Sequence, residues 1–304
     1  MIYTLTANPA IDYYLFFDNE LSYGINRTGK YSFEAGGKGV NVSRVLASFR
    51  EENICVILTG GFSGEYIGEQ LEKEDFIKVR NVPLEGISRI NVKIRCAGKE
   101  LDINTSGPQV DGSCREDFLA AFAEIKANDI VCFNGSLQAG VSELLAELAG
   151  ELRKKGARLV MDVPNLTLEE VLAYKPYLIK PNEEELQQLL HTDSVYPQLA
   201  MAAQKTLGKE GVKVLLSLGK DGSCYIDESR IIKLSVPPVK AVNTVAAGDS
   251  LLAGFIYALN REMPLETCLR YAASGGTAAV MRTELPSVEL ISTLLDQIIL
   301  TEVK

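Results

Sequence analysis

The chain has 304 residues, of which 46% are hydrophobic and 23% charged, with a formal net charge of −9 and a sequence pI near 4.9. This acidic balance argues against nucleic acid or an anionic membrane surface as a partner, because either would require a basic face. No segment approaches the roughly 20 apolar residues of a membrane span, and the N-terminus has no basic leader before an apolar run, so we expect a cytoplasmic protein. An α/β chain of this length commonly forms one domain, which we expect to span residues 1–304.

The cysteines and the histidine exclude several kinds of site. Six cysteines are scattered without a C-x-x-C pair, which favours buried reduced thiols over disulfides or a zinc site. His191 is the only histidine, so a metal site built from several histidines is excluded. A Ser-His-Asp triad would need His191, but its place at the end of a helical run favours a structural role.

Short β-rich runs alternate with amphipathic helical runs along most of the chain. Near-continuous apolar runs are typical of strands buried on both faces, so we expect a mostly parallel, doubly wound α/β sheet with helices on both faces. From about Leu251 the chain is expected to be almost wholly helical. The expected strands are 2–6, 55–58, 130–133, 158–161, 177–179 and 214–216, and the expected helices are 40–49, 116–126, 142–155, 197–207 and 251–259.

Two segments interrupt this alternation. Residues 12–33 contain apolar positions that alternate with polar ones, and residues 88–105 contain two such runs around an Ala97-Gly98-Lys99 turn. Half-exposed strands inserted into an α/β body can pair into a small separate sheet. We expect that sheet to act as a lid.

Residues 242–250 combine small residues with a carboxylate at the start of an apolar helix. Ala246, Ala247 and Gly248 leave the first backbone N–H groups open to an anion, and Asp249 can take a proton. This layout suits phosphoryl transfer, although Asp249 could also be an ordinary favourable charge in a first helical turn. No Gly-Lys pair is followed by Ser or Thr, which excludes a Walker A loop, and the stretch around Lys38 lacks the third glycine of a dinucleotide fingerprint.

Six motifs follow one another along nearly the whole chain: residues 4–12 (TLTANPAID), 35–42 (AGGKGVNV), 134–137 (NGSL), 179–185 (IKPNEEE), 217–222 (SLGKDG) and 242–250 (VNTVAAGDS). In this combination the chain resembles the ribokinase-like PfkB carbohydrate kinases, and within them the branch of 1-phosphofructokinase and tagatose-6-phosphate kinase. The resemblance implies a ribokinase-like fold, ATP and Mg²⁺ as cofactors, and a phosphosugar acceptor.

The resemblance assigns catalysis to the last motif. Asp249 would take the proton of a sugar hydroxyl that attacks the γ-phosphate of ATP. The backbone N–H groups of Ala247, Gly248 and Asp249 would face the developing negative charge. Ala246 stands where the family usually has a glycine; an alanine costs little there if φ is negative, and about 1 kcal/mol or more if φ is positive.

The nucleotide side is assigned in the same way. Asn182 and Glu185 lie three residues apart at a helix start and would hold Mg²⁺ through water, with a helix cap as the alternative. Lys180 would meet phosphate as a point charge. The remaining residues implied to bind the nucleotide are Ser217, Gly219, Gly222 and Gly275.

On the acceptor side, Asp12 and Asn41 would bind sugar hydroxyls, and the backbone of Gly36 and Gly37 would approach the ring closely. The acceptor's own phosphate needs local cations because the protein is acidic. The resemblance implies Arg27, Lys38 and Arg89 for this role, although each alone would be an ordinary solvated charge. Lys38 favours a phosphorylated acceptor over a neutral sugar.

The predicted activity is ATP-dependent phosphorylation of a ketohexose monophosphate. Fructose 1-phosphate, converted to fructose 1,6-bisphosphate, is the first choice, and a tagatose-6-phosphate kinase is the alternative. An alternative of another class, motivated by Ala246, is a catalytically impaired regulatory protein that binds a sugar phosphate. Gln138 and residues 283–286 also depart from the family pattern. A homodimer formed through the lid strands is implied by the resemblance.

Overall fold

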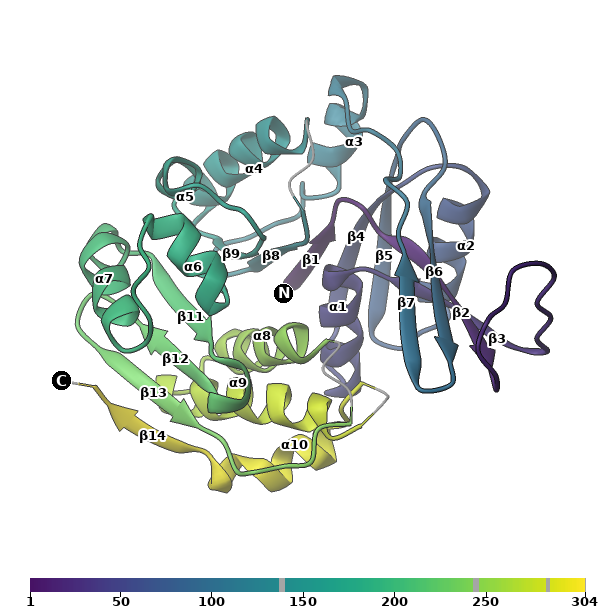
Figure 1. The fold of residues 1–304 in the computed structure, drawn as a ribbon. Helices are drawn as coiled ribbons and strands as arrows, with labels where there is room; N and C mark the ends of the chain where they lie inside the picture. Colours follow the sequence, from purple (N-terminus) through teal and green to yellow (C-terminus); the bar gives the residue numbers. More distant parts are fainter. Residues whose placement is uncertain (137–139, 243–245, 283–284, 304) are drawn as a thin grey trace.

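The computed structural model describes residues 1–136, 140–242, 246–282 and 285–303. At its centre is a ten-stranded sheet in the order β14-β13-β12-β11-β10-β9-β8-β1-β4-β5 (Figure 1). Neighbouring strands from β5 to β11 are parallel, whereas β12, β13 and β14 add to one edge in antiparallel fashion. The strands are β1 Ile2–Thr6, β4 Asn53–Thr59, β5 Ile77–Pro83, β8 Ile130–Asn134, β9 Arg158–Asp162, β10 Leu178–Ile179, β11 Lys213–Ser217, β12 Ser223–Ile226, β13 Ile231–Ser235 and β14 Ile299–Glu302.

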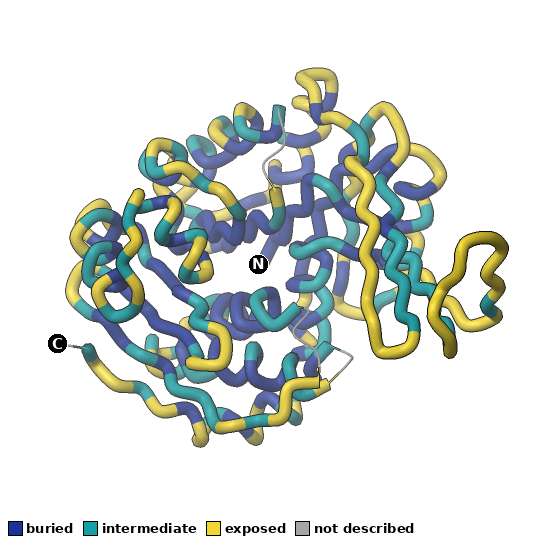
Figure 2. The backbone as a smooth tube through the Cα atoms, in the orientation of Figure 1, coloured by how far each residue is buried: buried dark blue, intermediate teal, exposed yellow. Residues whose placement is uncertain are grey.

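Helices cover both faces of this sheet. Successive strand residues point to opposite faces, so Val131 joins one hydrophobic core and Cys132 the other. The buried residues accordingly lie between the layers (Figure 2). One core is covered by α3 Arg115–Ala120, α4 Val141–Lys155, α5 Leu168–Tyr174, α6 Glu183–Leu190 and α7 Gln198–Thr206, and the other by α1 Lys38–Ser48, α8 Ala247–Asn260, α9 Leu265–Val280 and α10 Val288–Leu294.

The order of strands reverses beside β1. From β1 the chain builds outward to β4 and β5, and it then returns to place β8 on the other side of β1. In doubly wound sheets, ligands bind at the carboxyl ends of the strands at such a switch point. The predicted fold class is confirmed, and its topology directs attention to the ends of β1, β8 and β9.

The four other strands form the predicted small sheet, in the order β3-β2-β6-β7. Helix α2 (Gly61–Leu71) lies against β2 and β3 of this sheet and against β4 of the large one. The action of the small sheet as a lid and the assignment of the chain to one domain remain predictions. The strands are β2 Ala10–Phe17, β3 Lys30–Gly36, β6 Arg89–Cys96 and β7 Lys99–Ile103.

Three expected element boundaries were wrong. The C-terminal part is not wholly helical, because β14 pairs with β13; its side chains are mostly exposed, so it carries little apolar signal. Helix α3 ends at Ala120 rather than near residue 126, and the chain continues in turns that still bury Phe122 and Ile125. Helix α8 begins at Ala247, four residues before the apolar run that marked it.

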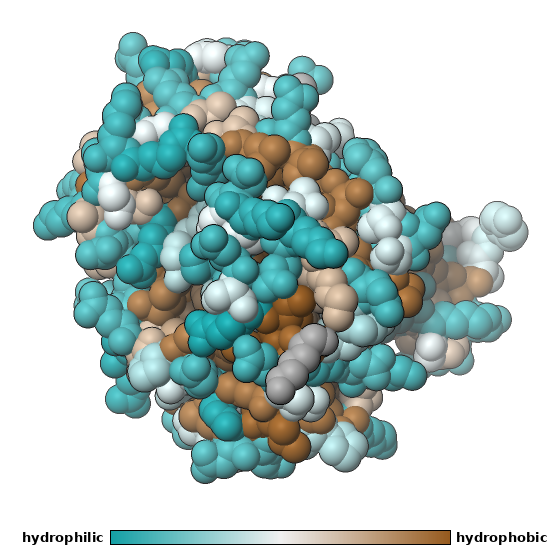
Figure 3. All heavy atoms as spheres, turned by 90° about the vertical axis from the view of Figure 1, so that its left-hand side faces the viewer, coloured by the Kyte–Doolittle hydropathy of each residue, from teal (hydrophilic) through white to brown (hydrophobic). Residues whose placement is uncertain are grey.

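The surface agrees with the composition. On the side that carries α7 and β14, hydrophilic side chains separate small apolar patches (Figure 3). Within the described residues, no helix is both long enough and apolar enough to cross a membrane.

Candidate active site

The side chain of Asp249 is buried in the first turn of α8, with 6% of the residue exposed. Asn41 on α1 donates a hydrogen bond from Nδ2 to Asp249 Oδ2 at 2.8 Å. The pKa of Asp249 is raised to about 6, chiefly by burial and then by the negative charge of nearby Asp162, although the hydrogen bond from Asn41 and the charges of two lysines act in the opposite direction. An ordinary first-turn charge would be solvated, so Asp249 differs from that alternative.

Two lysines near Asp249 lower its pKa, and both also pair with the neighbouring Asp162. Lys180 follows β10, and its Nζ lies 3.2 Å from Asp162 Oδ1; Lys38 begins α1, and its Nζ lies 3.4 Å from the same oxygen. A Cβ added to Gly248 would lie 3.1 Å from Lys180 Nζ, so this ammonium group sits beside the first turn of α8. Burial alone would lower the pKa of Lys180, but Asp162 and Asp249 outweigh burial and raise it, so Lys180 stays charged.

The start of α8 provides backbone donors. The first intrahelical bond at this end runs from Ser250 N to Ala246 O, so the N–H groups of Ala247, Gly248 and Asp249 have no partner within the helix. Among the described residues, no side chain caps α8 at Ala246. Their role in binding an anion, expected from the sequence, remains a prediction.

Ala246 occupies the left-handed region, with φ 60° and ψ 7°. This conformation costs a non-glycine residue roughly 1–2 kcal/mol. The sequence left the sign of φ open, and the structure gives the costly case. The chain keeps the turn despite the alanine.

We expect Ala246→Gly to raise the free energy of unfolding by about 1 kcal/mol, because glycine adopts this φ without strain. Ala247→Gly is the matched control, since Ala247 is helical and a helical glycine should cost about 0.5–1 kcal/mol. Urea unfolding of both variants would measure the difference. Equal destabilisation by both substitutions would contradict the left-handed assignment.

Among the residues predicted to bind the acceptor, the small sheet brings Asp12 over Gly36. A Cβ at Gly36 would collide with Asp12 Oδ2, so any other residue here would require the Asp12 side chain to move away. Asn91, paired with Asp12 between β6 and β2, donates from Nδ2 to Asp12 Oδ1 at 2.8 Å. Arg89 donates from Nε to the carbonyl of Asn8 at 3.1 Å, and burial lowers the pKa of its guanidinium.

Gly37 connects the small sheet to α1. Its φ of 134° is one that other residues rarely adopt, and a Cβ there would lie 2.8 Å from Thr6 Cγ2 at the end of β1. The glycine therefore lets the start of α1 approach the switch point. Lys38 and Asn41 follow directly on that helix.

Asn182 and Glu185, which are predicted to hold the metal, form a capping box for α6. Glu185 N donates to Asn182 Oδ1 at 2.8 Å, and Asn182 N donates to Glu185 Oε2 at 2.9 Å. A bridge joins Asn182 to Ser217 at the end of β11, from which the turn containing Gly219 leads into β12. The helix-cap alternative is therefore present, and a role in holding metal remains a prediction.

In the single chain, the surroundings of three predicted site residues do not point to a contact with ligand. Arg27 lies exposed in the loop between β2 and β3, which projects from the body of the molecule (Figure 1). This loop leaves the small sheet at the end where Phe16 pairs with Lys30, whereas Arg89 and the residues that lead to Lys38 lie at the opposite end. Gly275 lies inside α9, where a Cβ would collide with the carbonyl of Ser250, so close packing against α8 accounts for this glycine. Gly222 is required by its turn, because a Cβ would collide with Leu234 O.

The notable residues that were not predicted are Asp162 and Asn91. Asp162 ends an apolar strand at the switch point, which is the signal that could have identified it. Asn91 was hidden because the pairing of β2 with β6 joins segments far apart in the chain. Of the departures noted in the sequence, Gln138, Thr283 and Glu284 lie outside the described residues.

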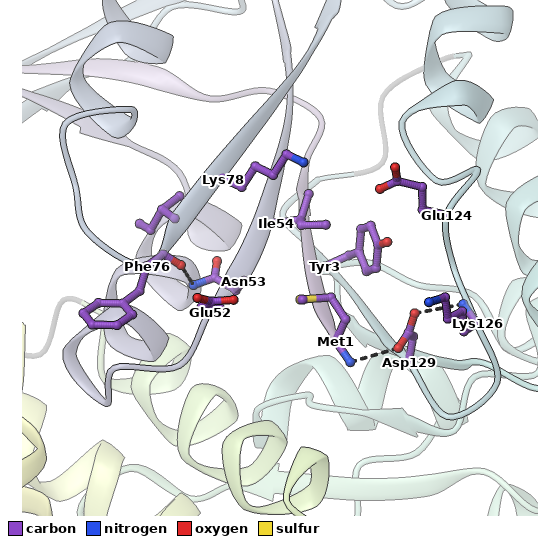
Figure 4. A pocket seen from close by; sticks show the side chains of 11 residues that line it. Met1, Tyr3, Glu52, Asn53, Ile54, Phe76, Lys78, Glu124, Lys126 and Asp129 are labelled. Atoms are coloured by element: carbon purple, nitrogen blue, oxygen red, sulfur yellow. Dashed lines mark hydrogen bonds and ion pairs between the residues drawn. The ribbon is translucent and has the colours of Figure 1, made fainter.

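A hollow of about 900 Å³ lies at the amino-terminal ends of the strands of the large sheet, opposite the ends where the predicted site lies (Figure 4). It is lined by the first residues of β1, β4 and β5 and by charged side chains such as Lys78, Glu124 and Asp129. None of the predicted site residues lines it. It therefore lies at the amino ends of the strands, away from the switch point.

A buried carboxylate beside two lysines and an open helix N-terminus, all at the switch point of a doubly wound sheet, is an arrangement suited to an enzyme acting on phosphate groups. The sequence model of a protein family described as "pfkB family carbohydrate kinase" matches residues 5–287 of the chain. The chain belongs to this family of carbohydrate kinases, as its motifs predicted.

Named relatives cover nearly the whole chain. A 1-phosphofructokinase of Bacillus subtilis is 32% identical over 303 residues, or 99% of each chain. A D-tagatose-1-phosphate kinase of Bacillus licheniformis is 32% identical over 311 residues, again 99% of each, and a tagatose-6-phosphate kinase of Staphylococcus epidermidis is 32% identical over 295 residues, or 93% of each.

Solved structures agree with the fold. Phosphofructokinase-2 of Escherichia coli in complex with fructose 6-phosphate has a TM-score of 0.86 and 28% identity, over 97% of this chain and 98% of that one. Ribokinase of Arabidopsis thaliana has a TM-score of 0.75 and 22% identity over 97% and 98%, which shows the ribokinase-like fold.

Proposed function

We propose that the chain transfers the γ-phosphoryl group of ATP to a ketohexose monophosphate, with fructose 1-phosphate as the preferred acceptor. The observation that carries the proposal is the buried Asp249 carboxylate, held by Asn41 beside the charged Lys180. The names of the relatives support a phosphorylated ketohexose as the acceptor class. A tagatose phosphate is the alternative acceptor.

The chemistry assigned to Asp249 is general base catalysis. The 6-hydroxyl of fructose 1-phosphate attacks the γ-phosphorus, the bond to the bridging oxygen of ADP breaks, and Asp249 takes the hydroxyl proton. Lys180 and the open N–H groups of α8 lie beside Asp249, where they can neutralise charge on the transferred group. Lys38, whose side chain is 39% exposed, is a cation available to the acceptor phosphate.

The donor set at the start of α6 fits a hydrated Mg²⁺ ion. Glu185 uses Oε2 in the capping box, and within the described residues Oε1 has no hydrogen bond. Asn182 and Glu185 supply the oxygen donors that this ion prefers, and they would hold it through water. When bound, the ion would offset the charge of the ATP phosphates. Lys180 and the turn from Ser217 to Gly222 complete the proposed nucleotide side, which a cytoplasmic ATP supply would serve.

The test of the acceptor is ADP release from a panel of sugars. We expect the highest kcat/KM with fructose 1-phosphate, lower values with tagatose 6-phosphate, tagatose 1-phosphate and fructose 6-phosphate, and the lowest with fructose. A preference for fructose would overturn the phosphosugar assignment. Binding of fructose 1-phosphate by calorimetry without ADP release from any sugar would instead select the regulatory alternative.

A pH dependence follows from the raised pKa of Asp249. The base must be ionised, so kcat should fall about tenfold per pH unit below pH 6. Sugar phosphates also titrate near pH 6, so the group has to be assigned by a direct measurement. The carboxyl carbon of Asp249, followed by NMR in substrate-free protein, should titrate near pH 6, whereas an ordinary value near 4 would contradict the assignment.

We also propose that the chain forms a homodimer through the small sheet. One face of this sheet is apolar across all four strands, because Phe33, Tyr13, Val92 and Ile103 pair side by side. Phe33 and Ile103 are 45% and 49% exposed, although α2 covers part of the face. A second copy would bury these residues. Light scattering should give twice the chain mass, and Ile103→Lys should give the monomer; a monomeric parent protein would contradict the proposal.

A further inference from the structure

Lys38 and Lys180 share one carboxylate oxygen. Their Nζ atoms lie 3.4 and 3.2 Å from Asp162 Oδ1, and the Asp162 side chain is only 2% exposed. The two lysines come from different elements, since Lys38 begins α1 and Lys180 follows β10. Asp162 ends β9, so its carboxylate lies between the two lysines. We call the ends of β8 and β9, formed by Asn134 and Asp162, the floor of the site.

Charge explains why this carboxylate is needed. Two buried or half-buried ammonium groups repel each other unless a negative charge lies between them. With Asp249 ionised, Lys38, Lys180, Asp162 and Asp249 carry two positive and two negative charges. Removing the charge of Asp162 would leave an excess positive charge and only a neutral, weaker acceptor for the lysines.

Asn134 provides a second observation at the same floor. It ends β8 and pairs with Asp162 in the parallel register. Asn134 is fully buried, yet both its side-chain oxygen and its nitrogen lack a hydrogen-bond partner among the described residues. Buried polar atoms are normally satisfied, so this floor is suited to receive a polar ligand atom.

We propose that Asp162 is a positioning residue, which fixes the ammonium groups of Lys38 and Lys180 between the acceptor phosphate and the transferred phosphoryl group. The proposal rests on the kinase function proposed above. Asp162 itself touches neither substrate. It acts through the two lysines and through its charge on Asp249.

That charge gives a measurable signature. Asp249 faces Lys38 on α1, Lys180 after β10 and Asp162 on β9, with the Cys132 thiol of β8 nearby. After burial, the negative charge of Asp162 is the main cause that raises the pKa of Asp249. Removing it leaves the two lysines, which lower that pKa. A neutral residue that only supports the fold would have no such effect.

The test is Asp162→Asn, which keeps the size and removes the charge. The NMR titration of Asp249 should move below the wild-type value of about 6, and kcat should fall about 100-fold because misplaced groups lose that much. An unmoved titration, or kcat within a few fold of wild type, would overturn the proposal. If the asparagine variant does not fold, Asp162→Glu should keep the titration near 6 and lower kcat; a glutamate variant with wild-type kcat would also overturn it.

Glu51→Gln is the matched control. Glu51 is another buried carboxylate, which accepts hydrogen bonds from Asn260 Nδ2 at 2.8 Å and Arg261 Nε at 3.0 Å, far from the switch point. Its substitution should lower the stability but leave the Asp249 titration and kcat unchanged. Because the titration needs no substrate, it tests the role of Asp162 even if the wild-type protein releases no ADP, an outcome that would count only against the kinase function.

Discussion

Asp249→Asn should lower kcat by roughly 10²- to 10⁴-fold, the range that general base catalysis contributes. The amide keeps the shape of the side chain and can still accept the hydrogen bond from Asn41, so the KM for fructose 1-phosphate should change little. Steady-state ADP release with saturating ATP would measure both constants. A near-normal kcat would contradict the assignment of Asp249 as the base.

Asp129→Asn is the control for this change. Asp129 is a buried aspartate at the amino-terminal ends of the strands, where its Oδ1 pairs with the N-terminal ammonium group at 2.9 Å. The same chemical substitution there should leave kcat unchanged. A loss of activity in both variants would indicate a general effect on folding rather than loss of a base.

Stability should respond differently from activity. The folded pKa of Asp249, about 6, exceeds its ordinary value of 3.8, so the folded state binds the proton more tightly than the unfolded chain. Stability from this group is therefore present below about pH 4 and is lost as the pH rises to 6, by up to about 3 kcal/mol. At pH 7.5, Asp249→Asn should not destabilise the protein, and urea unfolding would check this.

Lys38→Met should lower kcat/KM for fructose 1-phosphate by about 10- to 100-fold, because a hydrogen bond to a charged group contributes about 1.5–3 kcal/mol. The value for unphosphorylated fructose should stay nearly constant, since that sugar offers no phosphate to the lysine. The comparison of the two acceptors in one assay isolates the role. Equal losses with both sugars would place Lys38 on the transferred phosphoryl group instead.

Lys30→Met provides the matched control on the small sheet. Lys30 is exposed and pairs with Asp18 at 2.9 Å. Surface pairs of this kind contribute little. Its substitution should leave both acceptors unaffected, and a selective loss with fructose 1-phosphate would mean that general electrostatic attraction, rather than a contact at Lys38, favours phosphosugars.

The sequence alone determined the family, the alternation of strands and helices, and Asp249 as the candidate base. These features are local: apolar strands, short glycine-containing motifs and a carboxylate at a helix start are read within a few residues of each other. The alternating pattern of the two inserted segments could be recognised for the same reason, whereas the register of β2 against β6, which brings Asn91 beside Asp12, could not. The short edge strand β14 was not, because its exposed side chains lack a strong pattern.

Only the tertiary structure decided the surroundings that give these residues their chemistry. The positive φ of Ala246 depends on how the chain enters α8, and the raised pKa of Asp249 depends on burial against α1 and β9. Asp162 joins Lys38 and Lys180 across elements more than 100 residues apart in the chain. Charge interactions and burial depend on distance in space, which the order of residues in a single sequence does not contain.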